Sequence, residues 1–255
     1  MTGAEDPISG AADPSRIAPS DVRSVLESGD IDVHGRIAGS SNATLLVTCS
    51  FRGRELLAVY KPARGERPLW DFPRGLHRRE VAAYRLSELL GWDLVPETVE
   101  RADGPFGAGS LQRFVPTDGT SHYFTLVDDP QWHDALRRIA AFDVIANNAD
   151  RKSGHVLLAD GRIWAIDHGL CFHSLPKLRT VVWDFAGEPL LPRIRDDLRL
   201  LIANDGRALA DAFHGLLDRE ERAALHDRVA ALVGTGHLPS PDAEGDWPPY
   251  PWPLV

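Results

Sequence analysis

The sequence has few cysteines and no long apolar run. Its 255 residues include two cysteines, Cys49 and Cys171. Two cysteines cannot form a disulfide framework, and neither has a second cysteine at metal-ligand spacing, so we interpret both as small buried hydrophobic residues. No apolar segment reaches the roughly 20 residues that cross a bilayer, and the N-terminal segment is acidic where a secretory signal is basic and then apolar. We therefore expect a cytoplasmic protein without membrane insertion.

Positive charge is also scarce, because 28 Lys and Arg stand against 37 Asp and Glu and give a formal net charge of -9. Nonspecific nucleic-acid binding depends on Lys and Arg that neutralise phosphates, so this balance excludes nucleic acid as a partner. One local exception is the run 61–79, with six basic and two acidic residues. It is either a solvated surface or a patch that faces phosphate groups, since Arg side chains suit phosphate oxygens.

The order of element patterns predicts an α+β fold with two lobes, since strands come first and helices later. Extended patterns separated by turn residues predict an antiparallel sheet. The expected strands are 31–38, 43–51, 55–61, 97–101 and 109–115, with a helix at 76–90. The later expected helices are 131–145, 194–203, 208–217 and 219–233, with a short hairpin at 155–166.

The domain organisation follows from these patterns. We predict a disordered segment at 1–16, an N-terminal lobe at 17–115 and a mainly helical C-terminal lobe at 116–238. The remaining tail, 239–255, is rich in proline and tryptophan, which excludes a helix or a central strand. Its aromatic residues Trp247, Tyr250 and Trp252 are candidates to hold it against the body as an extended segment.

The most informative stretch is 142–169, in which a helix ends in a polar loop and a hairpin then ends on Asp167-His168-Gly169. The hairpin brings Asp167 back towards Asp150 in the loop. Phosphoryl transfer uses one carboxylate to orient or deprotonate the acceptor hydroxyl and another to hold Mg²⁺ against the phosphates. The alternative is purely structural: Asp150 caps the end of a helix, and Asp167 forms a turn.

These two loops resemble those of the phosphatidylinositol 3/4-kinase-like superfamily, which includes the HipA-type bacterial kinases. The resemblance lies in Asp150-Arg-Lys-Ser-Gly-His155 and Ile166-Asp-His-Gly169. It implies a two-lobed protein-kinase-like fold, with ATP bound between the lobes. It also implies that Asp150 is the catalytic-loop aspartate and Asp167 the Mg²⁺ ligand. Arg151 and Lys152, which follow Asp150, are candidates to stabilise the transferred charge.

The chain departs from the family pattern at two positions. Lys152 stands where the family usually has a histidine, and His155 stands where it has a metal-ligating asparagine. Imidazole is a poorer Mg²⁺ ligand than an amide oxygen, because hard cations prefer oxygen. This favours chemistry with one metal ion, chemistry assisted by Mn²⁺, or loss of activity.

The N-terminal lobe supplies candidate nucleotide-binding residues in the order that a kinase requires. Lys61 ends the third predicted strand, where kinases keep a lysine on the phosphates, and Glu80 in the next helix is its candidate ion-pair partner. Ser40 and Ser41 lie in a turn that can cover the phosphates. By position, Gln112, Phe114 and Val115 at the lobe junction can contact adenine.

These features together predict an ATP- and divalent-metal-dependent phosphotransferase. We expect its acceptor to be a protein Ser/Thr or a small soluble molecule, with autophosphorylation included, because no basic amphipathic membrane helix is apparent. Three alternatives stay open: a nucleotide-binding pseudokinase, an enzyme that transfers AMP, and an interaction scaffold that docks a partner through its tail.

Overall fold

The computed structural model describes residues 18–37, 42–203, 207–241 and 248–254. They divide into two compact units. The first comprises the described residues up to Arg67 together with Glu97–Phe114, and the second comprises Pro68–Pro96 and the described residues from Val115 on. No helix in the described residues is long and apolar enough to cross a membrane.

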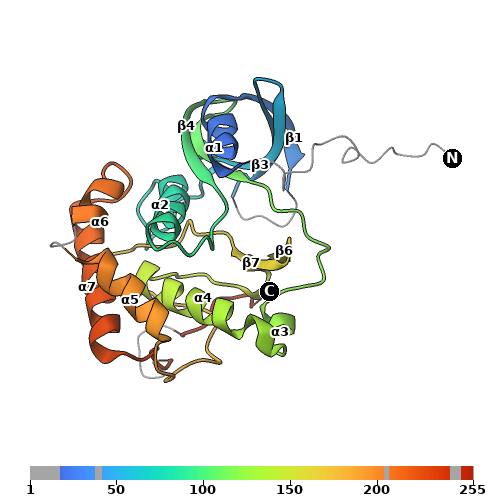
Figure 1. Ribbon diagram of the computed structural model, residues 1–255. Coiled ribbons are helices and arrows are strands. Elements are labelled where there is room, and N and C mark those ends of the chain that lie inside the picture. The colour runs from blue at the N-terminus through green and yellow to red at the C-terminus, as the bar shows by residue number, and fades with distance from the viewer. Residues whose placement is uncertain (1–17, 38–41, 204–206, 242–247, 255) are drawn as a thin grey trace. The chain divides into compact units, whose positions relative to one another are not determined.

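The first unit is a five-stranded antiparallel sheet covered on one face by a helix (Figure 1). The strands pair in the order β1-β2-β3-β5-β4. Their bounds are β1 Asp30–Arg36, β2 Leu45–Phe51, β3 Arg54–Pro62, β4 Thr98–Gly104 and β5 Gly107–Arg113. Helix α1, Pro19–Ser28, packs its apolar side chains Val22, Val25 and Leu26 on the sheet.

Alternation along β3 decides which of its side chains reach the opposite face of the sheet. Leu56, Ala58 and Tyr60 are buried in the same cluster as α1. Because successive side chains of a strand point to opposite faces, Lys61 lies on the other face. The register places Lys61 opposite Ser110 of β5, and Ser110 opposite Glu100 of β4.

The second unit is mainly helical and contains the larger hydrophobic core. Its helices are α2 Leu76–Leu89, α3 Tyr123–Leu126, α4 His133–Ala146, α5 Pro192–Leu201, α6 Arg207–Ala212 and α7 Arg219–Thr235. Helix α4 contacts α7 and the hairpin of β6, Val156–Ala159, and β7, Arg162–Ala165. Leu136, Ile139 and Phe142 of α4 have no exposed surface and form the centre of this core.

Helix α2 is tied to the second unit by a buried ion pair as well as by apolar packing. The Arg79 guanidinium contacts the Glu221 carboxylate at the start of α7 and donates to the Cys171 carbonyl at 2.6 Å. Ala82, Ala83 and Leu86 belong to the same core as α4. The segment 68–96 thus lies with the second unit, and the chain returns to that unit at Val115. The lobes expected at 17–115 and 116–238 stay predictions.

The predicted α+β class with an antiparallel sheet is confirmed, and most elements lie within a few residues of their expected bounds. Two differences are clear. The helix expected at 208–217 ends at Ala212, and the short helix α3 was not predicted. Segment 1–16 lies outside the described residues.

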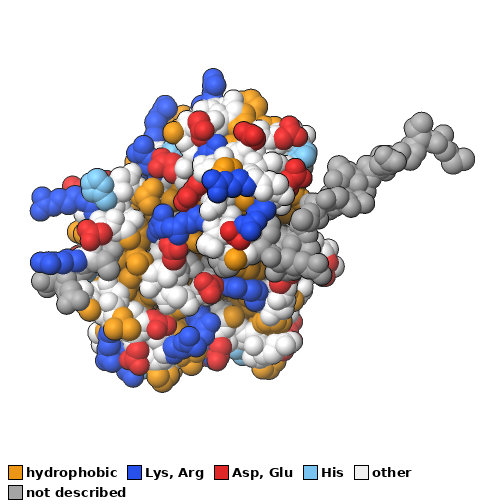
Figure 2. Space-filling view, turned by 45° about the horizontal axis from the view of Figure 1, so that its top comes forward, with side chains coloured by type: hydrophobic (Ala, Val, Ile, Leu, Met, Phe, Trp, Pro, Cys, Tyr) orange, Lys and Arg blue, Asp and Glu red, His pale blue; other side chains and the backbone are white. Residues whose placement is uncertain are grey.

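The run 61–79 does not form a single basic surface. Arg64, Arg67, Arg74 and Arg78 are exposed, but Arg79 is buried and ion-paired. On the face in Figure 2, Lys and Arg side chains are interspersed with Asp and Glu.

Candidate active site

The loop that carries Asp150 begins at the C-terminus of α4, where Asn147 adopts a left-handed conformation with φ of 52°. Asparagine tolerates this conformation better than most residues. Its amide group donates to the carbonyls of His173 at 2.9 Å and Leu175 at 2.7 Å, and its oxygen accepts from Lys177 N–H at 2.8 Å. Asn147 therefore ends the helix and fixes the segment that follows Asp167.

Four side chains meet on the partly exposed side of the two loops, and we call them the solvent-facing group: Asp150, Lys152, His155 and Asp167. The Lys152 ammonium lies 3.2 Å from the Asp150 carboxylate, and His155 Nε2 lies 3.4 Å from Asp167 Oδ2. Their side chains are between 14% and 49% exposed. The hairpin β6–β7 thus brings the two acidic loops together in space.

The electrostatics of Asp150 reflect this proximity. Burial raises the pKa of the Asp150 carboxyl above its ordinary value, and the negative charge of Asp167 raises it further. Lys152 and Arg179 act in the opposite direction. Asp150 and Asp167 therefore sense one another's charge.

The backbone after β7 turns at Asp167 itself, which has a φ of 61°. Gly169 lies beside α2, where an added Cβ would make ordinary contacts, 3.4 Å from Glu80 Oε1 and 3.6 Å from the Leu76 Cβ. The Asp167 loop therefore packs next to α2.

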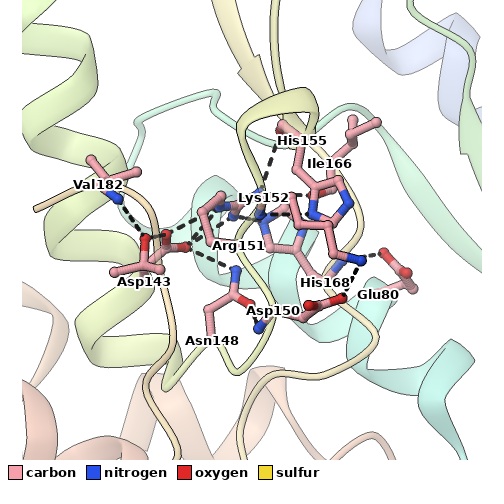
Figure 3. A network of polar contacts seen from close by, with 11 residues as sticks. Glu80, Asp143, Asn148, Asp150, Arg151, Lys152, His155, Ile166, His168 and Val182 are labelled. Carbon is pink, nitrogen blue, oxygen red and sulfur yellow. Dashed lines mark hydrogen bonds and ion pairs between the residues drawn. The ribbon is translucent and has the colours of Figure 1, made fainter. Parts of the chain in front are cut away.

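Behind the solvent-facing group lies a second set of side chains, which we call the buried group: Asp143, Asn148, Arg151, His168 and Thr180 (Figure 3 labels all of them except Thr180). Asp143 and Arg151 are joined by hydrogen bonds of 2.9 to 3.1 Å and have no exposed side-chain surface. A buried charge must be paired and hydrogen-bonded, and both requirements are met here.

The placement of Arg151 differs from its expected one. The sequence assigned it to transferred charge at the reacting centre, but its guanidinium is fully buried and bonded within the protein. Glu80 is also buried, and its Oε2 accepts a hydrogen bond from the backbone N–H of His168 at 3.0 Å. It therefore holds the Asp167 loop to α2, while the ion pair expected between Glu80 and Lys61 stays a prediction.

Three of the remaining predicted nucleotide residues, Gln112, Phe114 and Val115, lie on or next to β5. The Gln112 side chain is buried and donates to Thr98 Oγ1 at 2.9 Å, so its amide is already engaged within the sheet. The Phe114 N–H donates to the Leu57 carbonyl at 2.9 Å. Val115 packs in a small cluster of the second unit that includes Ala159 and Trp164. Ser40 and Ser41 lie outside the described residues.

The C-terminal tail is bonded through its backbone to the loop that carries Asp150 and to the segment around Thr180. The Leu254 carbonyl accepts from Ser153 N–H at 2.9 Å, and the Pro249 carbonyl accepts from Thr180 N–H at 3.0 Å and from the Trp183 indole at 3.1 Å. The aromatic residues that we expected to pin the tail point largely to solvent, since Trp252 is 88% exposed. Trp247 lies outside the described residues.

The donor set of the solvent-facing group fits a divalent cation that is shared with a nucleotide. Among the described residues, no group of three or more His, Cys, Asp or Glu side chains could hold a metal ion alone. Mg²⁺ is usually bound by one or two carboxylates together with substrate phosphates. The half-exposed Asp167 carboxylate and the nearby Asp150 provide that number of ligands.

Sequence reasoning missed Asp143 and Thr180. The signal for Asp143 was present, because it lies in the apolar run Phe142–Ala146, where a carboxylate that faces the core needs a cationic partner. Thr180 carries no such signal, because it reaches Asp143 only through the folded segment that follows Asp167.

Comparison with known proteins identifies a family for this chain. A search with family models finds no match. Protein Rv2133c of Mycobacterium tuberculosis is 39% identical over 268 residues, which cover 91% of this chain and 95% of that protein. The chain belongs to the family of protein Rv2133c.

The chain also has weak similarity to a eukaryotic kinase. Phosphatidylinositol 4-kinase gamma 4 of rice, Oryza sativa subsp. japonica, is 26% identical over 266 residues. The match covers 80% of this chain but only 46% of the rice protein. This weak similarity supports assignment to a kinase-like family.

Solved structures show the fold. The structure of hydra Fam20 with sugar gives a TM-score of 0.55 at 14% identity and covers 84% of this chain and 86% of that one. The Helicobacter pylori proinflammatory kinase CtkA gives a TM-score of 0.51 at 12% identity and covers 84% and 94%. The predicted protein-kinase-like fold is thereby confirmed.

Proposed function

We propose that this protein is an ATP- and divalent-metal-dependent phosphotransferase. The observation that supports this most directly is the meeting of Asp150, Lys152, His155 and Asp167 at the surface of two adjoining loops. Phosphoryl transfer asks a protein for positioning and charge stabilisation rather than for covalent chemistry. The site offers one carboxylate for the acceptor, one carboxylate for a cation and a lysine for the transferred group.

Asp150 orients and deprotonates the acceptor in this proposal. The acceptor oxygen bonds to the γ-phosphorus while the bond from that phosphorus to the bridging oxygen of ADP breaks, and the hydroxyl proton passes to Asp150. The raised pKa of Asp150, caused first by burial, makes its carboxylate a better proton acceptor than an exposed one. Lys152 stabilises the negative charge on the group in transfer.

Asp167 and His155 hold the cation. A bound divalent cation would neutralise charge on the β- and γ-phosphates. Asp167 supplies a hard carboxylate oxygen, whereas His155 supplies a softer nitrogen, and this pairing favours Mn²⁺ relative to a site made of oxygens alone.

We assign the nucleotide to the residues that the sequence predicts for it, which are Lys61, Glu80, Ser40, Ser41, Gln112, Phe114 and Val115. Lys61 binds phosphate oxygens and Glu80 orients Lys61. For Gln112 the proposal concerns its backbone groups, because its side-chain amide bonds to Thr98. The acceptor is a protein Ser/Thr, the chain's own included, or a small soluble molecule, within a family related to the phosphatidylinositol 3/4-kinases and the HipA-type kinases.

Transfer of label from ATP tests the proposal. With ATP labelled on the γ-phosphate, we expect transfer to the chain itself or to an added acceptor, in the presence of Mg²⁺ or Mn²⁺. Label that transfers only from the α-phosphate would instead identify an AMP-transferring enzyme. Vesicles that contain phosphatidylinositol, offered as acceptor, test the lipid class named in the rice relative.

Asp167→Asn should abolish the transfer while the protein stays folded, since the side chain is half exposed. Asp160→Asn is a matched control, because Asp160 is also exposed and also has a left-handed backbone, with φ of 54° against 61° for Asp167. Equal activity of Asp167→Asn and the wild type would contradict the metal assignment.

A nucleotide-binding pseudokinase is the second candidate, and the observation that favours it is His155. Its Nδ1 is 3.3 Å from the Lys152 backbone nitrogen and its Nε2 is 3.4 Å from Asp167, so the ring lies next to the proposed metal ligand. ATP binding without transfer of either label would support this candidate. Restoration of transfer by His155→Asn would then locate the cause in that residue.

A further inference from the structure

The side chain of Asp143 is enclosed within the protein and accepts hydrogen bonds from three other residues. Its Oδ1 accepts from Arg151 Nη2 at 2.9 Å and from the Asn148 amide at 3.0 Å, and its Oδ2 accepts from the Thr180 hydroxyl at 3.0 Å. These donors come from the loop after α4 and from the segment after Asp167. One carboxylate on a core helix therefore joins two stretches that are far apart in the sequence.

Arg151 extends this connection to both neighbours of Asp167. Its Nη1 donates to the Ile166 carbonyl at 2.8 Å, and its Nη2 lies 2.7 Å from His168 Nε2. A guanidinium only donates, so His168 Nε2 is the acceptor and its proton resides on Nδ1. Because Arg151 also directly follows Asp150, a single side chain sets the spacing between the two acidic loops (Figure 3).

Helix α4 constrains His168 from a second direction as well. The ring of Phe142, next to Asp143, makes an edge contact with the His168 ring at 5.5 Å between centroids. The helix thus supports the Asp167 loop by packing and, through Asp143 and Arg151, by charge.

A buried ion pair is weak evidence for stability, because apolar residues of similar volume often serve equally well. The pair is therefore better explained by its geometry than by its contribution to folding. Two apolar side chains can fill the space, but they cannot hold the Ile166 carbonyl and the His168 ring at defined positions.

We propose that Asp143 is a positioning residue for phosphoryl transfer: it orients Arg151, which in turn fixes Asp167 relative to Asp150. This inference rests on the proposed function of the site. Asp143 does not touch the nucleotide or the acceptor; it acts through Arg151. Residues that support ligating groups in this way typically affect activity by about 10- to 100-fold.

Replacement of the whole pair separates positioning from folding. In Asp143→Leu/Arg151→Met the charges are removed together, so the variant should unfold near the wild-type temperature. We expect its γ-phosphoryl transfer rate to fall about 10- to 100-fold, and the Mn²⁺ concentration for half-maximal rate to rise, because Asp167 is no longer held. Wild-type rate and Mn²⁺ dependence in this folded variant would overturn the proposal.

Thr180 offers a milder test that does not depend on the double variant. Thr180→Val keeps the shape but removes the hydroxyl that donates to Asp143, whereas Thr180→Ser keeps the hydroxyl. We expect a rate about tenfold lower for Thr180→Val and a rate near the wild type for Thr180→Ser. Equal rates in the two variants would contradict the role of Asp143 as a positioning residue.

The proposed function and the positioning role of Asp143 are contradicted by different results. If the wild-type protein transfers no label, the proposed function fails. Hydrogen exchange of the amides at 166–169 still reports on whether Asp143 and Arg151 hold the Asp167 loop in place. Faster exchange there in Asp143→Leu/Arg151→Met than in the wild type supports it, and unchanged exchange contradicts it. If the wild type is active and the double variant equally so, only the role of Asp143 is lost.

Discussion

The solvent-facing group and the buried group lie on opposite sides of the two acidic loops. They are built differently. Asp150, Lys152, His155 and Asp167 are joined by one contact per pair, of 3.2 and 3.4 Å, and remain partly exposed. In the buried group, Asp143 and Arg151 have no exposed side-chain surface and share several bonds of 2.9 to 3.1 Å. The comparison indicates a division of labour, in which groups that meet ligands stay accessible and fully bonded groups hold them in place.

This contrast makes a prediction about each side. Changes in the solvent-facing group should affect transfer with little change in the free energy of unfolding, since exposed ion pairs contribute about 0–1 kcal/mol. Changes that leave one member of the buried group without its partner should affect both, unlike the joint replacement of Asp143 and Arg151. The variants below test that separation, from the largest expected effect to the smallest.

Lys152→Met should give the largest effect. Loss of one charge-stabilising donor from a reacting centre typically costs about 100- to 1,000-fold in rate, and Tm should change little because Lys152 is partly exposed. Lys152 also lowers the pKa of Asp150. Its removal should raise that pKa, so the acid limb of the rate profile should move to higher pH, because only the ionised carboxylate accepts a proton.

Lys177→Met is the matched control for this variant. Lys177 is also a partly buried lysine in an ion pair, 3.1 Å from Asp71, but it lies outside the solvent-facing group. Rates measured across pH for both variants check the prediction. An acid limb that moves equally in both, or in neither, would break the assignment of Lys152 to the chemistry.

Removal of the tail from residue 248 onwards should have an intermediate effect. The deletion takes away the carbonyls that accept from Ser153 and Thr180. Water can replace these acceptors in part, so we expect a rate about tenfold lower rather than complete loss. Trp252→Ala in the full chain is the control, since that side chain is 88% exposed and its loss leaves the backbone contacts intact. A faster truncated protein would instead identify the tail as inhibitory.

The solvent-facing group was accessible from the sequence, and the buried group largely was not. Asp150 and Asp167 follow from a local rule, because a hairpin returns the chain to where it left the helix. Thr180 and the tail carbonyls act through tertiary contacts that no local pattern encodes. Arg151 was noticed but assigned to the wrong surroundings, because residue type alone does not distinguish an exposed guanidinium from a buried one.

Local rules had the same limits in the fold. Extended runs separated by turn residues predicted the five strands of the sheet. The membership of α2 in the second unit depends on Arg79 and Glu221, whose pairing joins distant parts of the chain.

Asn147 tests the support with a smaller effect. Asn147→Gly keeps the left-handed backbone but removes three hydrogen bonds, so the free energy of unfolding should fall by about 1–3 kcal/mol. Asn147→Ala should cost about 1–2 kcal/mol more, because alanine resists a φ of 52°. Urea denaturation measures both values, and equal stability of the two variants would contradict the role of the backbone conformation.

His173 should give the smallest effect, one that is visible only as a pH dependence. Burial, followed by the positive charges of Lys177 and Arg79, lowers the pKa of His173 below its ordinary value of 6.5. In the unfolded chain His173 therefore binds a proton at a higher pH than in the folded one, so the folded protein loses stability as pH falls through about 6.5. The comparison is the decrease in Tm between about pH 7.5 and about pH 5.5, which should be smaller in His173→Gln than in the wild type. Lys177→Met should also reduce it, because one of the charges that oppose protonation is removed. An identical decrease in all three proteins would show that His173 is not part of the pH-sensitive support of the Asp167 loop.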